Sequence, residues 1–234
     1  MKAEVDYGQF CPVAMAAEVL CTRWTMLVVR ELICGSKRFN DLRRGVPRMS
    51  PALLSRRLKE LEQAGIIRRV ASGKESGLFE YHLTRSGRDL QAVVEAMGLW
   101  GHHWVETSAV LQKLDPALLM WDMRRRLDPT LMPRRRCVIQ FLYSDLPAAR
   151  RGHWLITTPG EEIEVCSVDP GFDTDLYVAT DVRTMTAVWM GLASFAGALR
   201  EKKIVLTGDK TLANTMQKWL NFSAFASEKK LARA

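Results

Sequence analysis

The first half of this chain is organised around a short amphipathic segment, residues 50–64, whose polar side is basic. Ser50 suits the N-cap of a helix, Pro51 suits its first position, and Gly65 ends the run. The predicted buried stripe is Leu54, Leu58 and Leu61, and the opposite side carries Ala52, Ser55, Arg56, Lys59 and Gln63. A helix of this kind either reads DNA or simply faces solvent, and its surroundings decide between the two.

The segments around residues 50–64 predict further helices and one hairpin. Helices are expected over residues 12–20, 23–34, 38–44 and 86–105, and hairpin strands over residues 66–70 and 78–83. Three helices, the basic helix, a hairpin and a last helix occur in the order of a winged helix-turn-helix domain. In that domain the second helix of the turn enters the major groove of DNA, and the hairpin lies along the DNA backbone.

The net charge of +8 is concentrated around the same segment. Residues 21–90 hold 15 Lys and Arg against 7 Asp and Glu, while the rest of the chain is balanced. This excess favours an anionic partner such as nucleic acid or a membrane surface. With 47% hydrophobic residues in 234, the chain has enough apolar side chains for one large or two ordinary domains.

The chain shows no signal-type leader and no run of about 18 uncharged apolar residues, so we expect a cytoplasmic protein without membrane insertion. Five widely spaced cysteines without a CxxC pair predict neither a disulfide framework nor a zinc site. His102, His103 and Glu106 have a spacing compatible with metal binding, but we interpret them as the polar end of a helix. No metal and no cofactor are predicted.

Several spaced motifs resemble those of HxlR-type bacterial transcription regulators over nearly all of residues 10–105. They are Cys11-Pro12-Val13-Ala14, Arg23-Trp24-Thr25, Arg30-Glu31-Leu32, Arg38-Phe39-Asn40-Asp41-Leu42, the run from Ser50 to Glu62, Gly65-Ile66-Ile67-Arg68-Arg69 and Tyr81-His82-Leu83-Thr84-Arg85-Ser86-Gly87-Arg88. The resemblance implies a homodimer, joined through the first and last helices, that binds a near-palindromic operator in double-stranded DNA.

The same resemblance assigns individual residues to the DNA. The residues expected to face the major groove are Ser50, Pro51, Ala52, Ser55, Arg56 and Lys59. Arg56 is the best candidate for a bidentate contact with guanine. Lys37, Arg38 and the hairpin residue Lys74 are expected to contact phosphates, which fixes register rather than sequence.

Cys11 has two interpretations. Some relatives use a cysteine at this position to sense oxidants or electrophiles, which makes Cys11 a candidate redox sensor. The alternative is a small, partly buried side chain, and no His, Lys or Arg adjacent in sequence activates the thiol.

Residues 107–234 predict a second domain after a winged-helix domain of residues 1–106. A helix after Pro116 is followed by strands at residues 137–143, 153–158, 161–167 and 176–180, a helix at 181–199, a strand at 203–207 and a closing helix. This α+β order predicts a mainly antiparallel sheet with helices packed on it. Arginines 124–126 and 134–136 either meet an anionic group or face solvent.

The second half, with Asp181-Val182-Arg183-Thr184-Met185 and the run from Lys203 to Asp209, resembles the sterol-carrier-protein-like fold. That fold encloses an apolar tunnel, so Met185, Trp189, Leu192 and Phe195 are the side chains expected to line a cavity for a lipid-like or aromatic molecule. The alternative is that these four residues fill a solid core.

These features together predict a transcription regulator whose C-terminal domain senses an apolar ligand. The second function that we carry forward is a lipid-binding carrier with a basic interaction domain. An enzyme is not expected, because the chain contains no G-x-S-x-G, HExxH, P-loop or paired-carboxylate motif.

Overall fold

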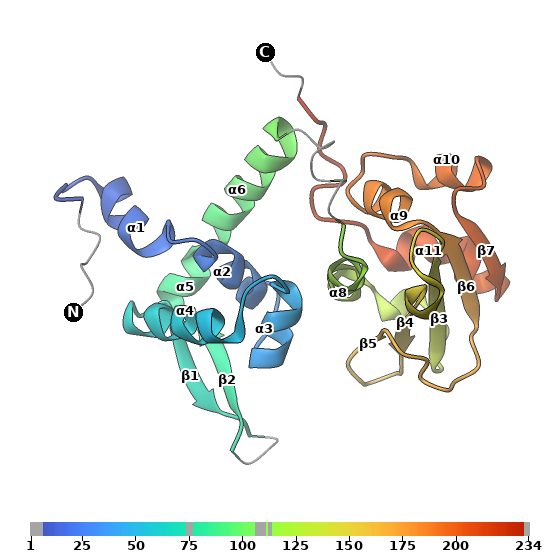
Figure 1. Ribbon diagram of the computed structural model, residues 1–234, viewed down its shortest axis with the longest axis horizontal. Helices are drawn as coiled ribbons and strands as arrows, with labels where there is room; N and C mark the ends of the chain where they lie inside the picture. Colours follow the sequence, from blue (N-terminus) through green and yellow to red (C-terminus); the bar gives the residue numbers. More distant parts are fainter. Residues whose placement is uncertain (1–6, 74–76, 106–110, 112–113, 232–234) are drawn as a thin grey trace. The chain divides into compact units, whose positions relative to one another are not determined.

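The computed structural model describes residues 7–73, 77–105, 111 and 114–231 of the chain (Figure 1). The chain divides into two compact units, Met1–Gly98 and Leu99–Ala234, each with a hydrophobic core of its own. The domain boundary expected between residues 106 and 107 lies outside the described residues, so that boundary stays a prediction.

The N-terminal half follows the predicted order of elements. Its elements are α1 (Pro12–Leu20), α2 (Thr25–Ile33), α3 (Phe39–Gly45), α4 (Pro51–Gln63), β1 (Ile67–Ala71), β2 (Phe79–Leu83), α5 (Arg85–Asp89) and α6 (Gln91–Trp104). The last predicted helix is divided in two at Leu90, which caps the C-terminus of α5. This arrangement is a winged helix-turn-helix, with α3 and α4 as the two helices of the turn.

The predicted leucine stripe anchors α4. Leu54, Leu58 and Leu61 are at most 1% exposed and pack in one core with apolar residues of α2, α3 and the start of β1. The strands β1 and β2 pair antiparallel from Ile67 opposite Leu83 to Ala71 opposite Phe79. This hairpin is the wing of the domain.

Two helices carry unusual apolar surface. Neither α1 nor α6 has a buried residue among those described, and Figure 1 shows α1 apart from the helices that surround the core. Exposed apolar side chains on or next to these helices are Phe10, Val13, Met15, Val19, Val93, Met97, Trp100 and Trp104. Within the described residues, no single helix is long and apolar enough to cross a membrane, and α1 with α2 pass that test only as a pair bent by 84°.

The C-terminal unit is built on a five-stranded sheet. Its elements are α8 (Pro116–Arg126), β3 (Cys137–Tyr143), β4 (Gly152–Thr157), β5 (Glu164–Cys166), β6 (Leu176–Thr180), α9 (Val182–Trp189), α10 (Phe195–Arg200), β7 (Val205–Gly208) and α11 (Lys210–Leu220), with 3-10 turns at Pro129–Leu131 and Ala148–Arg150. The strand order is β5-β4-β3-β6-β7, with β3 and β6 parallel and the other three pairs antiparallel. The mainly antiparallel α+β arrangement is confirmed.

Alternation along the strands separates the two faces of this sheet. Ile139 and Phe141 of β3 lie opposite Leu176 and Val178 of β6 and join the core formed with α8, α9, α10 and α11. Val138, by contrast, belongs to a small separate cluster with Trp154 and Ile156. Successive side chains of a strand point to opposite faces, so the core and the small cluster lie on opposite faces of the sheet. All four helices contribute side chains to the core and therefore pack on the same face.

The helix predicted over residues 181–199 is wrong in its extent. It is two helices, because the chain turns at Gly191, which has a φ of +76° and whose added Cβ would overlap the carbonyl of Ala226. Ser194 then begins α10 by accepting a hydrogen bond from the Gly197 amide at 3.1 Å. The strand predicted over residues 161–167 is also shorter, since Gly160 turns the chain at φ +82° and pairing starts only at Glu164.

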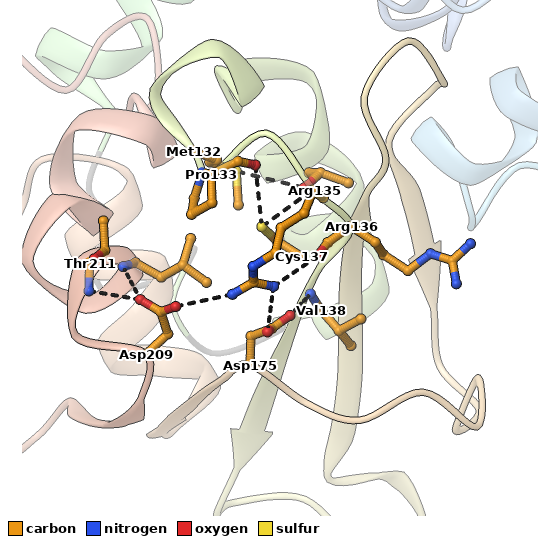
Figure 2. Close-up of polar contacts among 11 residues, drawn as sticks. Met132, Pro133, Arg135, Arg136, Cys137, Val138, Asp175, Asp209 and Thr211 are labelled. Atoms are coloured by element: carbon orange, nitrogen blue, oxygen red, sulfur yellow. Dashed lines mark hydrogen bonds and ion pairs between the residues drawn. The ribbon is translucent and has the colours of Figure 1, made fainter.

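A charged cluster joins the ends of three strands of the C-terminal unit (Figure 2). Arg135 donates from Nη1 to Asp175 Oδ1 at 2.6 Å and from Nη2 to Asp209 Oδ2 at 3.0 Å. Asp175 also accepts from the Val138 amide at 2.8 Å, and Asp209 accepts from the Thr211 amide at 2.8 Å. The cluster therefore ties the starts of β3, β6 and α11 together.

Candidate nucleic-acid interface

The candidate interface begins at the N-terminus of α4. Ser50 caps the helix by accepting a hydrogen bond from the Leu53 amide at 3.3 Å, and Pro51 occupies the first helical position. All six residues expected to face the groove are exposed, namely Ser50, Pro51, Ala52, Ser55, Arg56 and Lys59. Because the leucine stripe anchors the other side, the helix presents these six residues together to solvent.

Arg56 is held in place by its own helix. Its Nε donates to Glu60 Oε1 at 3.1 Å, one helical turn further along, and its side chain is 55% exposed. Glu60 also pairs with Arg57, which is only 8% exposed and to which the sequence analysis gave no role. One carboxylate thus orders two neighbouring arginines, of which only Arg56 faces out.

Lys37 and Arg38 lie beside the wing. The Lys37 carbonyl accepts a hydrogen bond from the Tyr81 amide at 2.8 Å, and the backbone of Arg38 forms an isolated antiparallel β-bridge with Glu80. Lys37 is exposed and Arg38 half-buried. The third predicted phosphate contact, Lys74, lies outside the described residues.

Further basic side chains lie on the elements next to α4 in the chain, and they are not among the predicted DNA contacts. They are Arg43 and Arg44 of α3, Arg48 of the turn between α3 and α4, and Arg68 and Arg69 of β1, all of them exposed. The signal was present in the sequence, because three of these arginines lie in the eight residues before Ser50. They add exposed positive charge to the elements that precede and follow α4 in the chain.

Arg69 has an ordered position on the wing. Its guanidinium lies 3.6 Å from the centre of the Phe79 ring on the neighbouring strand, and its backbone amide donates to Glu62 Oε1 at 3.3 Å. A guanidinium stacked on an aromatic ring keeps its charge at the surface while its flexible stem is restrained. The wing thus carries a restrained positive charge on β1.

Cys11 is exposed at the N-cap position of α1. The backbone amides of Ala14 and Val13 lower the pKa of its thiol below the usual range, because they stabilise the thiolate. The metal site considered at His102, His103 and Glu106 includes one residue, Glu106, that lies outside the described residues. Among the residues that the structure describes, no group of three or more His, Cys, Asp or Glu is arranged to hold a metal ion.

Of the four residues proposed to line a cavity in the C-terminal unit, three belong to its hydrophobic core. Met185, Trp189 and Phe195 are 0%, 5% and 6% exposed, while Leu192 is half-buried in the turn between α9 and α10. The Phe222 ring, from the segment after α11, packs against both Trp189 and Phe195, with centroids 6.4 and 5.9 Å apart.

The arginine run at 124–126 is used inside the C-terminal unit. Arg124 donates from Nε to the Ile163 carbonyl at 2.5 Å, Arg125 pairs with Asp122 at 3.2 Å, and Arg126 donates to the Phe222 carbonyl at 3.2 Å. In the second run, Arg135 joins the cluster with Asp175 and Asp209. These contacts give both runs a structural role.

Comparison with known proteins gives a consistent result for the first half of the chain. Residues 19–109 match the family model described as HxlR-like helix-turn-helix. The HTH-type transcriptional regulator YvaP of Bacillus subtilis is 32% identical over 105 residues, which cover 44% of this chain and 97% of the relative. The regulator sll1512 of Synechocystis sp. is 37% identical over 101 residues, 43% of this chain and 75% of the relative. The solved structure of the reduced form of the transcriptional regulator YodB from B. subtilis is 36% identical, covers 42% of this chain and 97% of that one, and has a TM-score of 0.37.

Proposed function

Because this chain belongs to the HxlR-like helix-turn-helix family of transcriptional regulators, we propose that it binds a near-palindromic operator as a homodimer. In each protomer α4 would enter the major groove of double-stranded DNA and the wing would lie along the backbone. The observation that carries this proposal is the surface of α4, where an exposed polar face stands on a buried leucine stripe between two groups of exposed arginines.

The residues divide into two roles at the DNA. Arg56 would place its terminal nitrogens against guanine O6 and N7, with Nε held by Glu60. Ser50, Ala52 and Ser55 would lie close to the base edges, while Lys59 would approach from the same side of α4. Lys37, Arg38 and Lys74 would contact phosphates, and we add Arg43 of α3 to this second group.

The exposed apolar surfaces of α1 and α6 support a homodimer. Phe10 and Val13 are 98% and 75% exposed, and Met97 and Trp100 of α6 are 54% and 63% exposed. Large exposed apolar residues concentrated on two helices are typical of a surface that another chain covers. A two-fold dimer would present two copies of α4 to two half-sites of a palindromic sequence.

Substitution of Arg56 by alanine tests the proposed base contact. We expect Arg56→Ala to reduce the discrimination between operator and random DNA by roughly 1–3 kcal/mol, because the bidentate contact is lost. The measurement is a pair of fluorescence anisotropy titrations at fixed salt, one with the duplex that the wild-type protein enriches from a random library and one with a scrambled duplex.

Arg43→Ala is the matched control for this titration, since it removes the same side chain from α3. It is expected to weaken the binding of both duplexes about equally, as is Lys74→Ala, because phosphate contacts carry no sequence information. An Arg56→Ala variant that kept the full ratio of the two affinities would contradict the assignment.

We also propose that the C-terminal unit binds an apolar, lipid-like molecule that modulates DNA binding. In support, Trp189 and Phe195 form an aromatic cluster with Phe222, and the sterol-carrier-protein-like fold that the sequence resembles would have its apolar tunnel among these residues. A ligand would act only through different affinities for the DNA-competent and DNA-incompetent dimer. A lipid carrier, the alternative function, would bind the same ligand but would not discriminate between the two duplexes.

A further inference from the structure

Glu31 of α2 is a carboxylate buried in the helix-turn-helix core. Its exposed fraction is 0%, and its neighbours in α2, Val28 and Leu32, belong to the core that also anchors α4. A carboxylate removed from water is unfavourable unless charged or polar partners surround it. A position such as this one therefore requires an explanation beyond packing.

The partners of Glu31 come from its own helix and from the turn that follows. Arg30 donates to Glu31 Oε1 from Nε at 3.2 Å and from Nη2 at 2.5 Å. Ser36, which is 7% exposed, donates from Oγ to Oε2 at 3.4 Å. Both carboxylate oxygens are thus engaged, which fixes the orientation of the group.

This carboxylate lies directly against the last residue of α3. A Cβ added to Gly45 would overlap both oxygens of Glu31, and Nη2 of Arg30 donates to the Gly45 carbonyl at 3.1 Å. Gly45 does not have a left-handed φ, so the backbone conformation does not require glycine here. The close approach of the carboxylate requires it instead.

Gly45 is five residues before the N-cap of α4. Between them Val46 and Met49 are buried in the core, and the Met49 amide donates to the Val46 carbonyl at 2.9 Å. The turn is therefore held at its beginning by the Glu31 group and along its length by the core. Its end is Ser50, where the proposed DNA-reading face starts.

We propose that Glu31 is a positioning residue for DNA recognition: with Arg30 it fixes Gly45, and thereby the place of the α4 N-terminus relative to α2. This inference rests on the proposed function, because it concerns how the same surface is aimed. Base contacts depend on placement to a fraction of an ångström, whereas phosphate contacts tolerate displacement. Loss of the Glu31 group should therefore reduce specific binding more than non-specific binding.

The test compares variants of the full-length protein by the two-duplex titration described above. Glu31→Gln keeps the size of the side chain but removes its charge, and Gly45→Ala introduces the overlapping methyl group. We expect each to lower the ratio of the two affinities by roughly 5- to 100-fold, the range for loss of a base contact. Val28→Ala is the matched control, because it weakens the same helix by a core cavity and is expected to leave that ratio unchanged.

A double variant separates positioning from simple loss of stability. In Glu31→Ala the carboxylate is absent, so adding Gly45→Ala should lower the ratio no further, because the methyl group then has space. Circular dichroism confirms that each variant is folded at the temperature of the titration. The comparison of Glu31→Ala with the double variant stays informative even if the single Gly45→Ala variant does not fold.

Three outcomes overturn the inference in different ways. Glu31→Gln with an unchanged ratio, or with the same loss as Val28→Ala, would show that Glu31 only stabilises the domain. Independent, multiplicative effects in the double variant would show that Gly45 is not constrained by the carboxylate. A wild-type protein that enriches no duplex would overturn the proposed function and this inference together.

Discussion

At the scale of single residues, Cys11 offers a prediction about reactivity. The amides of Ala14 and Val13 lower the pKa of its thiol. At a pH below the usual pKa of cysteine, a larger fraction of this thiol is therefore ionised than of an unperturbed cysteine. Cys11 is therefore expected to react with iodoacetamide faster at pH 7 than a model thiol such as N-acetylcysteine. Its rate should fall only when the pH drops through the lowered pKa. Peptide mass spectrometry over a range of pH measures this rate.

Ala14→Pro is the control for Cys11, because proline removes one of the two backbone amides that lower the pKa of the thiol and is tolerated in the first helical turn. It should slow the reaction towards the model rate. An equal rate in wild type and variant would contradict the proposed cause. A redox-sensor role would further require that mild oxidation crosslinks the protein through Cys11 and changes its affinity for DNA.

The sequence predicts exposed residues of the interface better than buried polar ones. Leucine spacing places Ser55, Arg56 and Lys59 on the outer side of α4, and all three are exposed. Periodicity gives no sign that Arg57 is buried or that Glu31 touches Gly45, since both facts depend on contacts between elements distant in the sequence. Burial and contacts of this kind arise from tertiary packing, which the hydrophobic pattern of the sequence does not display.

At the scale of elements, the cap of α11 predicts a dependence of stability on pH. Asp209 accepts from the Leu212 and Thr211 amides and from Arg135, and these contacts lower its pKa. Asp209→Ala should cost about 0.5–2 kcal/mol at pH 7, the usual effect of losing an N-cap. The contribution of a carboxylate with a lowered pKa is complete above its unfolded pKa and is lost as the pH falls through the folded pKa. The gap between wild type and variant should therefore close under acid conditions.

Thermal unfolding followed by tryptophan fluorescence at pH 7 and at pH 3 measures this effect. Ser194→Ala is the control, because Ser194 caps α10 with a neutral hydroxyl and its loss should have the same cost at both values. A deficit of Asp209→Ala that does not change between the two pH values would contradict the linkage.

Element positions follow from the sequence wherever local signals are strong. The strands Cys137–Tyr143 and Leu176–Thr180 begin and end where their apolar runs predict. The region 181–199 shows the limit of such reasoning, because its apolar side chains continue at helical spacing through Gly191 although the chain bends there. The bend uses a left-handed φ of +76° at Gly191, and the Ala226 backbone leaves no space for a side chain there; helical periodicity cannot register either fact.

At the scale of the whole molecule, the apolar surface of α6 predicts the oligomeric state. Trp100→Glu should convert the proposed dimer into a monomer, because a carboxylate would be buried in the proposed interface. Native mass spectrometry measures the mass and also detects any co-purified apolar molecule in the C-terminal unit. Tyr177→Glu is the control, since it places the same charge on an exposed residue of β6 and should leave the dimer intact. A Trp100→Glu protein that stays dimeric would exclude this face.

The proposed function requires that this chain reads a specific DNA sequence through α4. Its most direct test is the selection of duplexes from a random library by the wild-type protein, followed by hydroxyl-radical footprinting of the enriched sequence. We expect a near-palindromic site with two protected half-sites on one side of the DNA helix, and an affinity that falls steeply with salt. Equal binding of all sequences, without a footprint, would contradict it.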